Sequence, residues 1–571
     1  MNDLVQTRTF AFTFALAVTT MLNSATEASQ QATDDARKLV EERTAKLRPL
    51  EIATNLAWWK ANISGKDEDF RAKEEAENRL NEALADPLAF RKLKQAKERG
   101  QVDDAVVARA IEVLYLAALE KQVDRFLLEK MVSKSNAVEK AFNAFRAKLD
   151  GKELTQNDVR KILEESSSSE DRRKAWEASK AVGPVLEKDL NELVKLRNES
   201  ARQLNFPNYH ALQLYLNEQE GDELIKIFDE LDGLTREPFQ QAKAEIDLAL
   251  ARQSKVGPDE IMPWHYHDLF FQETPKISET DLDAPFRKAD LPKITRDFYA
   301  SIGLPVDDVL ARSDLYEKPG KSPHAFCTDI DRNGDVRVLC NLVNDSYWMS
   351  TMLHEFGHAV YSSKNIPQSV PYVLRREAHI LTTEGVAMMF ERVTKRSAWL
   401  KKMGLSVKDP QAYDAAGLRD RRYQLLIFSR WCQVMLRFEK SMYENPDQDL
   451  GKLWWDLVEK YQMVKRPPGR HAPDYAAKIH IVSAPVYYHN YMLGQLFASQ
   501  VHHTIAREVM SGADPDSVMY VGNKGVGRFM RQRVFEPGRK LSWNGLTQEA
   551  TGQPLSAQAF AADLGPSAAE D

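Results

Sequence analysis

Apolar side chains recur at helical spacing through most of residues 34–250, and this periodicity limits the fold more than any other feature. Residues 74–100 and 103–131 are clear examples, rich in Glu, Lys, Arg, Ala and Leu, and Pro87 divides the first of them. In such segments one helix face is apolar and the opposite face is charged. Residues 255–345 are less regular, and strong helical patterning returns after them. The pattern predicts a mostly α-helical protein, one large unit whose two lobes are interwoven along the chain.

The composition is that of a globular protein with ample apolar material for a large core. Of the 571 residues, 43% are hydrophobic and 28% are charged. The formal net charge of -6 gives no basic surplus, which argues against nucleic acid as a partner. No repeat of fixed period and no low-complexity linker divides the chain. We therefore expect residues 29–571 to form a single domain.

The first 28 residues differ from the rest of the chain. Arg8 precedes an apolar run from Phe10 to Leu22, and small residues follow up to Ala28. The run is short for a transmembrane helix and is typical of a secretory signal, with cleavage near the end of this stretch. An uncleaved anchor or a disordered tail is the alternative. We expect residues 1–28 to be a signal peptide and the mature protein to be secreted or periplasmic, with no membrane segment.

A β-hairpin is expected within the irregular region. The segment 324–342 alternates around Asn333-Gly334, a dipeptide that favours a two-residue hairpin turn. Pairing outward from this turn places Cys327 opposite Cys340 at a non-hydrogen-bonded position, where Cα atoms lie closest. That separation is near the short end of the range that a disulfide accepts, and an exported protein would oxidise the pair. We therefore expect a Cys327–Cys340 disulfide, the alternative being two reduced thiols.

The segment LHEFGHAVY carries two histidines four residues apart. On a helix, His354 and His358 share one face, so both imidazoles can reach one ion. Zinc suits two neutral imidazoles and a carboxylate, with water in an open fourth position. Glu355 is placed to take a proton from that water. Flanking apolar residues and a capping residue, Asp345 or Ser346, favour the helix. The alternative is a helix with two structural histidines.

A third metal ligand is expected downstream, in the segment RREAHILTTEGVAMMFER. Glu384 begins an apolar helical stretch and could project inward from a second helix. Glu377 lies in a charged cluster and is expected to be more exposed. Glu391 follows Glu384 by two turns on the same face and is suited to orienting a ligand. His379 is a further candidate ligand, although a surface or supporting position suits it better. Spacing alone leaves these candidates open.

Together these motifs resemble the angiotensin-converting enzyme (peptidyl-dipeptidase A) family of zinc metallopeptidases, with a secondary likeness to the thimet oligopeptidase group. HEFGHAVY resembles the metal-binding helix of the family, and REAHILTTEG resembles the segment of its third ligand. LWWDLVEKYQ and KIHIVSAPVYYHNYMLGQLF are similar to further family segments, and the second of these carries substrate-binding side chains. The resemblance spans most of the chain after the leader. It implies a helical, two-lobed peptidase with a deep central cleft and a small β-sheet beside the metal helix.

The resemblance also implies the composition of the metal site. It implies one zinc ion with three protein ligands, His354, His358 and Glu384. Glu355 corresponds to the general base of the family. The pair Cys327 and Cys340 matches a family disulfide, with a shorter loop between the two cysteines.

A second set of residues matches the substrate-binding groups of the family. Lys478 corresponds to the lysine that binds the C-terminal carboxylate of the peptide. His480 corresponds to a histidine that binds the peptide backbone and the transition state. Tyr491 and Tyr488 correspond to tyrosines that stabilise the oxyanion and hold the carboxylate, with Tyr487 a rival for Tyr488. The alternative is an exposed lysine and tyrosines that belong to the core.

Three positions depart from the family. The arginine that helps the family bind chloride is Asn490 here, which leaves chloride binding undecided. The aspartate four residues after the glutamate ligand is Met388, so another group must orient the metal histidines. The carboxylate-binding glutamine of the family has no clear equivalent, because MPWHYHDLFFQ offers His265 and Tyr266 where it is expected.

These residues predict a zinc-dependent peptidyl-dipeptidase that acts on oligopeptides with a free C-terminus. Lys478 would fix the terminal carboxylate by charge-assisted hydrogen bonding, so that cleavage occurs near that terminus. The edge strand of the hairpin is expected to bind extended peptide with little sequence preference. Two alternatives stay open. One is an endo-oligopeptidase or single-residue carboxypeptidase on the same scaffold, and the other is a non-catalytic peptide-binding homologue.

Overall fold

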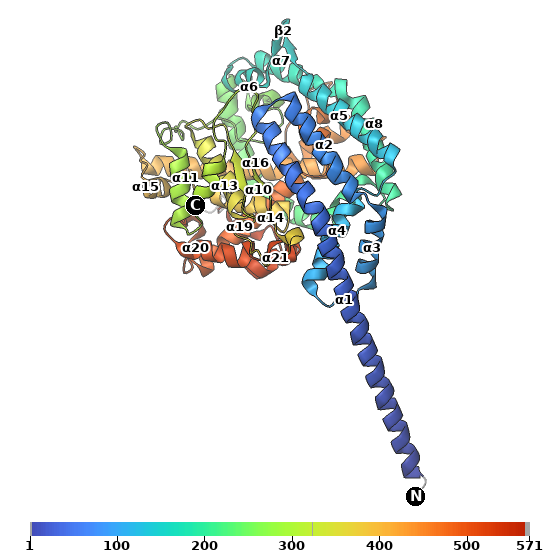
Figure 1. The fold of residues 1–571 in the computed structure, drawn as a ribbon. Helices are drawn as coiled ribbons and strands as arrows, with labels where there is room; N and C mark the ends of the chain where they lie inside the picture. The colour runs from blue at the N-terminus through green and yellow to red at the C-terminus, as the bar shows by residue number, and fades with distance from the viewer. Residues whose placement is uncertain (1–2, 323, 566–571) are drawn as a thin grey trace.

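The structure is a computed structural model that describes residues 3–322 and 324–565 (Figure 1). The side chains of residues 3–28 and of Gln156 are not described, so the expected signal peptide falls outside the described side chains and stays a prediction. In the described chain, helices dominate and the strands form two antiparallel hairpins. The prediction of a mostly α-helical fold is therefore confirmed. Among the described residues, no helix combines the length and apolar character needed to cross a bilayer.

Ten helices and one hairpin make up the first half of the described chain. The hairpin pairs β1 (Ala147–Leu149) with β2 (Lys152–Leu154). The helices are α1 (Asp3–Ser64), α2 (Asp67–Leu84), α3 (Pro87–Arg99), α4 (Ala105–Leu119), α5 (Arg125–Ala144), α6 (Gln156–Glu165), α7 (Ser169–Lys180), α8 (Val182–Gln203), α9 (Tyr209–Leu216) and α10 (Gly221–Ser254).

The second half carries the metal-motif segment and the remaining helices. Its hairpin pairs β3 (Phe326–Asp329) with β4 (Val336–Leu339). The helices are α11 (Leu291–Ser301), α12 (Asp307–Arg312), α13 (Ser346–Val360), α14 (Ile380–Glu391), α15 (Ser397–Lys402), α16 (Pro410–Glu444), α17 (Leu450–Gln462), α18 (Ile479–Ser483), α19 (His489–Glu508), α20 (Lys524–Phe529), α21 (Trp543–Thr551) and α22 (Gln558–Ala562).

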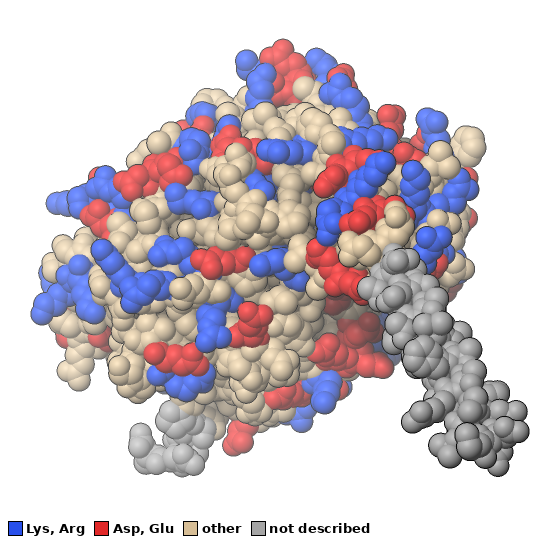
Figure 2. Space-filling view, turned by 60° about the horizontal axis from the view of Figure 1, so that its bottom comes forward, with Lys and Arg blue, Asp and Glu red and all other residues tan. Residues whose placement is uncertain are grey.

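In Figure 1, most helices from the first half of the chain lie on one side of the molecule, and several helices from the second half lie on the other. Helices α2, α3, α4, α5 and α8 gather on one side, and α11, α13, α15 and α20 lie on the other. Helices α14, α16 and α19 lie between these two groups, where α19 packs against both α14 and α16. The division into two interwoven lobes stays a prediction. On the face shown in Figure 2, acidic and basic side chains are mixed rather than gathered into a patch of one sign.

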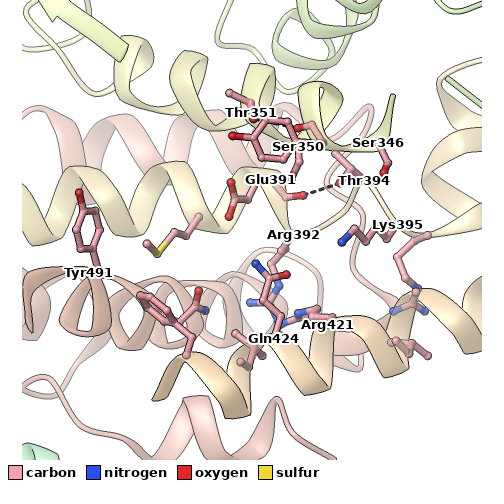
Figure 3. A pocket seen from close by; sticks show the side chains of 18 of the residues that line it. Ser346, Ser350, Thr351, Glu391, Arg392, Thr394, Lys395, Arg421, Gln424 and Tyr491 are labelled. Carbon is pink, nitrogen blue, oxygen red and sulfur yellow. Dashed lines mark hydrogen bonds between the residues drawn. The ribbon is translucent and has the colours of Figure 1, made fainter. Parts of the chain in front are cut away.

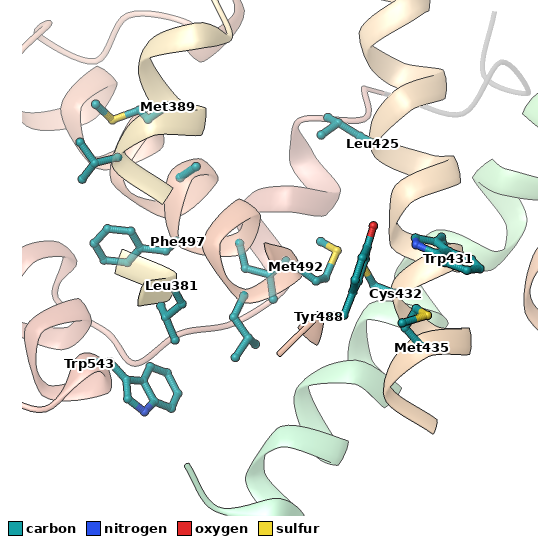
Figure 4. Packing of buried hydrophobic residues seen from close by; sticks show 14 of the residues in the cluster. Leu381, Met389, Leu425, Trp431, Cys432, Met435, Tyr488, Met492, Phe497 and Trp543 are labelled. Carbon is teal, nitrogen blue, oxygen red and sulfur yellow. The ribbon is translucent and has the colours of Figure 1, made fainter. Parts of the chain in front are cut away.

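The core between α14, α16 and α19 is built from large apolar side chains (Figure 4). Leu381 and Met389 of α14 lie on the same side of α19 as Phe497, whereas Met492 of α19 lies beside Tyr488, and all four apolar side chains are fully buried. The fully buried Trp431 of α16 lies on the side of this core opposite α14, next to Tyr488. Burial of side chains of this size provides most of the stabilising free energy of such a core. This packing fixes α14, which carries Glu384, against α19.

Glycines bring the backbones of three helices into close contact. A Cβ atom at Gly385 of α14 would lie 2.6 Å from the carbonyl oxygen of Gly494 in α19. A Cβ atom at Gly357 of α13 would lie 2.7 Å from Cα of Ala387 in α14. Real Cβ atoms do not approach neighbours so closely, so only glycine fits at these two positions. Helices α13, α14 and α19 are therefore held at a spacing that no larger residue would allow.

The second hairpin exists as expected but in a different register. Cys327 pairs with Val338, and the backbone N–H of Ile330 donates to the carbonyl of Asp335 (2.8 Å). Four residues, 331–334, therefore form the loop, instead of the two expected at Asn333-Gly334. The carboxylate of Asp331 explains the difference, because it accepts hydrogen bonds from the backbone N–H groups of Asn333 and Asp335 and so caps the wider loop.

The changed register removes the expected disulfide. Cys340 lies beyond the residue that pairs with Cys327, and both cysteines are free thiols. The prediction of a Cys327–Cys340 disulfide is therefore wrong. The error came from assigning a two-residue turn to Asn333-Gly334, since each residue added to the loop shifts the pairing of all that follow.

Candidate metal centre and cleft

The structure brings two histidines and one glutamate together between α13 and α14. His354 Nε2 lies 3.2 Å from His358 Nε2, and Glu384 Oε2 lies 3.5 Å and 3.8 Å from these two nitrogens. Ligand atoms around tetrahedral zinc, with bonds of about 2.1 Å, lie about 3.4 Å apart. Two imidazoles and one carboxylate at this spacing fit a zinc ion with a fourth position left open.

The other ring nitrogens of the two histidines are held by hydrogen bonds. His354 Nδ1 lies 2.8 Å from Glu391 Oε2, and His358 Nδ1 lies 2.8 Å from Thr383 Oγ1. These contacts direct both Nε2 atoms toward the same point, as is usual for metal-binding histidines. Burial lowers the pKa of His358 to about 4, which keeps this imidazole in the neutral form that binds metal.

The alternatives for the third ligand lie elsewhere. Glu377 Oε1 accepts a hydrogen bond from Arg376 Nη2 (2.7 Å), and Glu391 contacts the outer nitrogen of His354. His379 caps the N-terminus of α14, where its Nδ1 accepts from the backbone N–H of Leu381. Glu384 is the candidate whose carboxylate reaches both inner nitrogens.

Glu355 is a buried carboxylate beside these three side chains. Its residue is 6% exposed, and within the described part of the chain its Oε2 has no hydrogen-bond partner. Burial raises the pKa of Glu355 to about 7, with the charge of His354 opposing this shift and the carboxylates of Glu384 and Glu391 adding to it. A carboxyl group that titrates near neutral pH is suited to both accepting and donating a proton.

Two neighbouring cavities lie at or beside this centre. The metal cavity, of about 550 Å³, is lined by His354, Glu355, His358, Glu384 and strand β3 among others. The basic cavity, of about 470 Å³, is lined by His480, Tyr488 and several arginine and lysine side chains. Figure 3 shows the basic cavity with Tyr491 at one end. Met388 and Tyr491 border both cavities, which therefore adjoin, and the two adjoining cavities are called the cleft below.

Lys478 is buried in an aromatic environment beside this cleft. Its residue is 5% exposed, and its Nζ lies 5.2–5.4 Å from the ring centroids of Phe270, Trp431 and Tyr488. Nζ donates one hydrogen bond, to Oε1 of Gln272 (2.5 Å), and among the described residues it forms no ion pair. Burial lowers the pKa of Lys478 to about 8, so the group is mostly a cation at neutral pH.

Gln272, the hydrogen-bond partner of Lys478, was not predicted from the sequence. It ends the segment MPWHYHDLFFQ, seven and six positions after the expected His265 and Tyr266. Those two side chains serve the fold instead, since His265 Nε2 contacts Ser169 Oγ and the hydroxyl of Tyr266 donates to Asp247. The sequence does contain a glutamine in the expected segment, but its contact with Lys478 is visible only in the folded chain.

The tyrosines cluster around His480. The ring centroids of Tyr488 and Tyr491 lie 4.8 Å and 6.2 Å from that of His480. Tyr488 and Tyr491 both line the cleft, whereas Tyr487 lines neither cavity and stacks edge-on against Tyr491. Burial lowers the pKa of His480 to about 3, so its ring is neutral and one nitrogen carries a hydrogen. Asn490 faces the core, where its Oδ1 accepts from Gln219.

Comparisons with known proteins agree with this arrangement. Residues 310–566, which contain the metal centre, match the model of peptidase family M3, and residues 30–242 match the model named angiotensin-converting enzyme. The angiotensin-converting enzyme-related protein of Drosophila melanogaster is 24% identical over 244 residues, which cover 40% of this chain and 38% of that protein. The alignment thus spans well under half the length of that relative. Both matching families are metallopeptidases, which implies a zinc cofactor. The matches support a relationship to the angiotensin-converting enzyme family, together with similarity to peptidase family M3.

Proposed function

We propose that the protein is a zinc-dependent peptidyl-dipeptidase that releases dipeptides from the C-terminus of oligopeptides. The observation that carries this proposal is the buried Lys478 ammonium, which has the neutral amide of Gln272 as its hydrogen-bond partner. A buried cation is stabilised strongly by a carboxylate that hydrogen-bonds to it. The free C-terminus of a peptide supplies such a carboxylate, and Tyr488, whose ring centroid lies 5.3 Å from Lys478 Nζ, lines the basic cavity.

The zinc ion would be held by His354, His358 and Glu384. When bound, it supplies Lewis-acid chemistry, polarising the scissile carbonyl and lowering the pKa of water. Glu355 takes the proton of the attacking water and later delivers it to the leaving amine, a double role that suits a pKa near 7. The neutral ring of His480 and the hydroxyl of Tyr491 donate hydrogen bonds to the oxygen on which negative charge develops.

Strand β3 offers a second means of holding the peptide. In the described chain β3 pairs with β4 alone, and residues 325–329 line the metal cavity. An extended peptide can add to this free edge through backbone hydrogen bonds, which read little of its sequence. This mode suits an enzyme that acts on many oligopeptides. We also propose that the protein is exported, because its first 28 residues have the pattern of a secretory signal.

Product mass spectrometry on a matched peptide pair tests the activity. The two peptides share one sequence, and one has a free C-terminus while the other is amidated. We expect dipeptide release from the free peptide, loss of this activity with a chelator, and its recovery with zinc. Single-residue products would indicate a carboxypeptidase, and internal cleavage of both peptides would indicate an endo-oligopeptidase. If neither peptide is cut but both bind, the protein is a peptide-binding homologue.

A further inference from the structure

The basic cavity is lined by positively charged side chains that have no role in the proposed function. Its lining includes four basic side chains, Arg392, Lys395, Arg396 and Arg421, and one acidic side chain, that of Glu391. Glu391 Oε2 is engaged by His354 Nδ1 at 2.8 Å. The cavity adjoins the metal cavity, because Met388 and Tyr491 line both.

Two of the four basic side chains have acidic partners of their own. Lys395 Nζ lies 2.6 Å from Asp420 Oδ2, and Arg396 Nε lies 4.0 Å from Asp414 Oδ1. These pairs belong to the contact between α16 and the segment that follows α14. They leave Arg392 and Arg421 as the groups whose charge is not separately balanced.

Arg392 and Arg421 share a single carboxylate, that of Asp563. Arg392 Nη2 lies 2.9 Å from Asp563 Oδ1, and Arg421 Nη2 lies 3.2 Å from Oδ2. The same carboxylate also accepts from Ser499 Oγ (2.7 Å) and contacts His503 Nε2 (2.9 Å). Asp563 therefore has no capacity left for further hydrogen bonds, while two guanidinium groups depend on it.

Most of the donors of these two guanidinium groups have no partner. Each guanidinium has five N–H donors, but among the described residues each makes one hydrogen bond, to Asp563. The Arg392 side chain is 6% exposed, and its Nη1 is buried with no partner in the described chain. Burial and the neighbouring charge of Arg392 lower the pKa of Arg421 to about 10, so the Arg421 side chain stays charged at neutral pH. Buried donors of this kind are generally satisfied by a ligand or by water.

We propose that Arg392 and Arg421 form a subsite for an acidic side chain, Asp or Glu, in the dipeptide that the enzyme releases. The inference rests on the proposed function, since His480 and Tyr488, which would hold that dipeptide, line the same cavity. Strand β3 lines the metal cavity and not the basic cavity. Figure 3 shows Arg392 and Arg421 close together on the wall of the basic cavity. A planar carboxylate matches the fork geometry of guanidinium donors, and a neutral amide satisfies them less well.

Matched peptides test the subsite on the zinc-loaded protein. One series places Glu or Gln at each position of the C-terminal dipeptide of an otherwise constant peptide, with free and amidated termini. For the wild type we expect kcat/KM to be about tenfold higher for Glu than for Gln at one of the two positions. The preference should disappear in Arg421→Gln and be reduced in Arg421→Lys. Arg419→Gln is the matched control, because Arg419 is an exposed residue two positions away on α16, and this variant should keep the preference.

Binding gives a readout that does not depend on turnover. The Kd of each peptide for zinc-loaded Glu355→Gln protein, measured by calorimetry, should show the same preference for Glu. If the wild type cuts no peptide, the proposed dipeptidase activity fails, and the Kd values still decide the subsite. Equal kcat/KM and equal Kd for Glu and Gln peptides would overturn the subsite alone. The subsite would also be overturned if kcat/KM and Kd depended on whether the C-terminus is free but not on whether the side chain is Glu or Gln.

Discussion

The carboxyl group of Glu439 on α16 accepts a hydrogen bond from the backbone N–H of Val486, with 2.8 Å between Oε1 and N. Val486 has a φ of 56°, in the left-handed region that β-branched residues avoid. It lies two residues before Tyr488, in the turn between α18 and α19. The spacing from His480 to the tyrosines in this turn is one residue longer than the family resemblance implies. Glu439 therefore stabilises a strained turn that presents Tyr488 and Tyr491 to the cleft.

Two substitutions of Glu439 should distinguish the effect of its hydrogen-bond acceptor from the effect of its ionisable group. Burial raises the pKa of Glu439 to about 8, so the group is largely protonated at neutral pH and resembles an amide. We expect Glu439→Gln to be at least as stable as the wild type at pH 7, because the amide keeps the acceptor and has no proton to lose on unfolding. Glu439→Leu leaves the N–H of Val486 without its acceptor, and should lower the free energy of unfolding by about 1–3 kcal/mol. Calorimetric melting measures both variants, and a leucine variant as stable as the glutamine variant would contradict the role.

The same residue should make stability depend on pH. Glutamate in an unfolded chain has a pKa of about 4.3, whereas burial raises the folded value for Glu439 to about 8. The folded state thus favours the protonated form, and this contribution is complete at low pH and is lost as the pH rises through 8. The melting temperature of the wild type, relative to Glu439→Gln, should fall between about pH 4 and pH 8 and then level off. Parallel curves for the two proteins would show that Glu439 does not titrate in this way.

Removal of the Lys478 cation should affect one class of substrate. For Lys478→Met we expect KM to rise about 10- to 100-fold for peptides with a free C-terminus, because a charge-assisted hydrogen bond is lost. Amidated peptides never form that bond, so their KM should change little. Gln272→Leu should have a smaller effect of the same kind, because it leaves the cation in place. Steady-state kinetics on the peptide pair measures the effect, and an equal change for both peptides would refute the anchor.

Zinc affinity should depend on Glu391. Its carboxylate contacts His354 Nδ1, and loss of such a partner typically lowers metal affinity about 10- to 100-fold. We expect Glu391→Ala to show this loss in a competition titration with a zinc chelator. Glu377→Ala is the matched control, since Glu377 also lines the metal cavity but pairs with Arg376. Equal loss in both variants would point to a general effect of charge in the cavity.

Two glycine-to-alanine substitutions should have opposite effects on stability, because one glycine lies at the contact of α14 with α19 and the other lies in α10 with open space beside it. Gly385→Ala places a Cβ atom 2.6 Å from the carbonyl oxygen of Gly494, and should destabilise the protein by about 1–3 kcal/mol. Gly233 lies inside α10, and a Cβ atom there meets nothing within 4 Å. Gly233→Ala should therefore stabilise the protein by up to about 1 kcal/mol through helix propensity. Similar melting temperatures for the two variants would contradict the backbone contact.

Local chemistry was enough to predict where two helices begin, because strong capping signals mark their first residues. Asp86 caps α3 just before Pro87, as the break at that proline indicates, and Asp345 caps α13 ahead of the metal motif. The segment 103–131 shows where such reasoning stops. It is divided between α4 and α5, because the side chain of Asp124 accepts from Leu127 N and starts a new helix. An aspartate inside an amphipathic run can cap a helix or lie on its surface, and periodicity does not distinguish the two.

For the site, spacing along one helix was predictable and contacts between segments were not. The four-residue interval places His354 and His358 together on any helix, whereas the choice of Glu384 over Glu377 depends on how α14 meets α13. Gln272 lies more than two hundred positions from Lys478, so nothing local marks their contact. The hairpin register was wrong for a similar reason, since the capping of the loop by Asp331 competes with the turn preference of its neighbours.

The glycine contacts between α13, α14 and α19 have a consequence for engineering the metal centre. Where helices touch through their backbones, no side chains lie between them that could be enlarged or trimmed to change their spacing. The distances among His354, His358 and Glu384 are thus insensitive to redesign of the surrounding core. We therefore expect the metal preference of this centre to respond to changes of the ligand residues themselves more than to changes in the core around them.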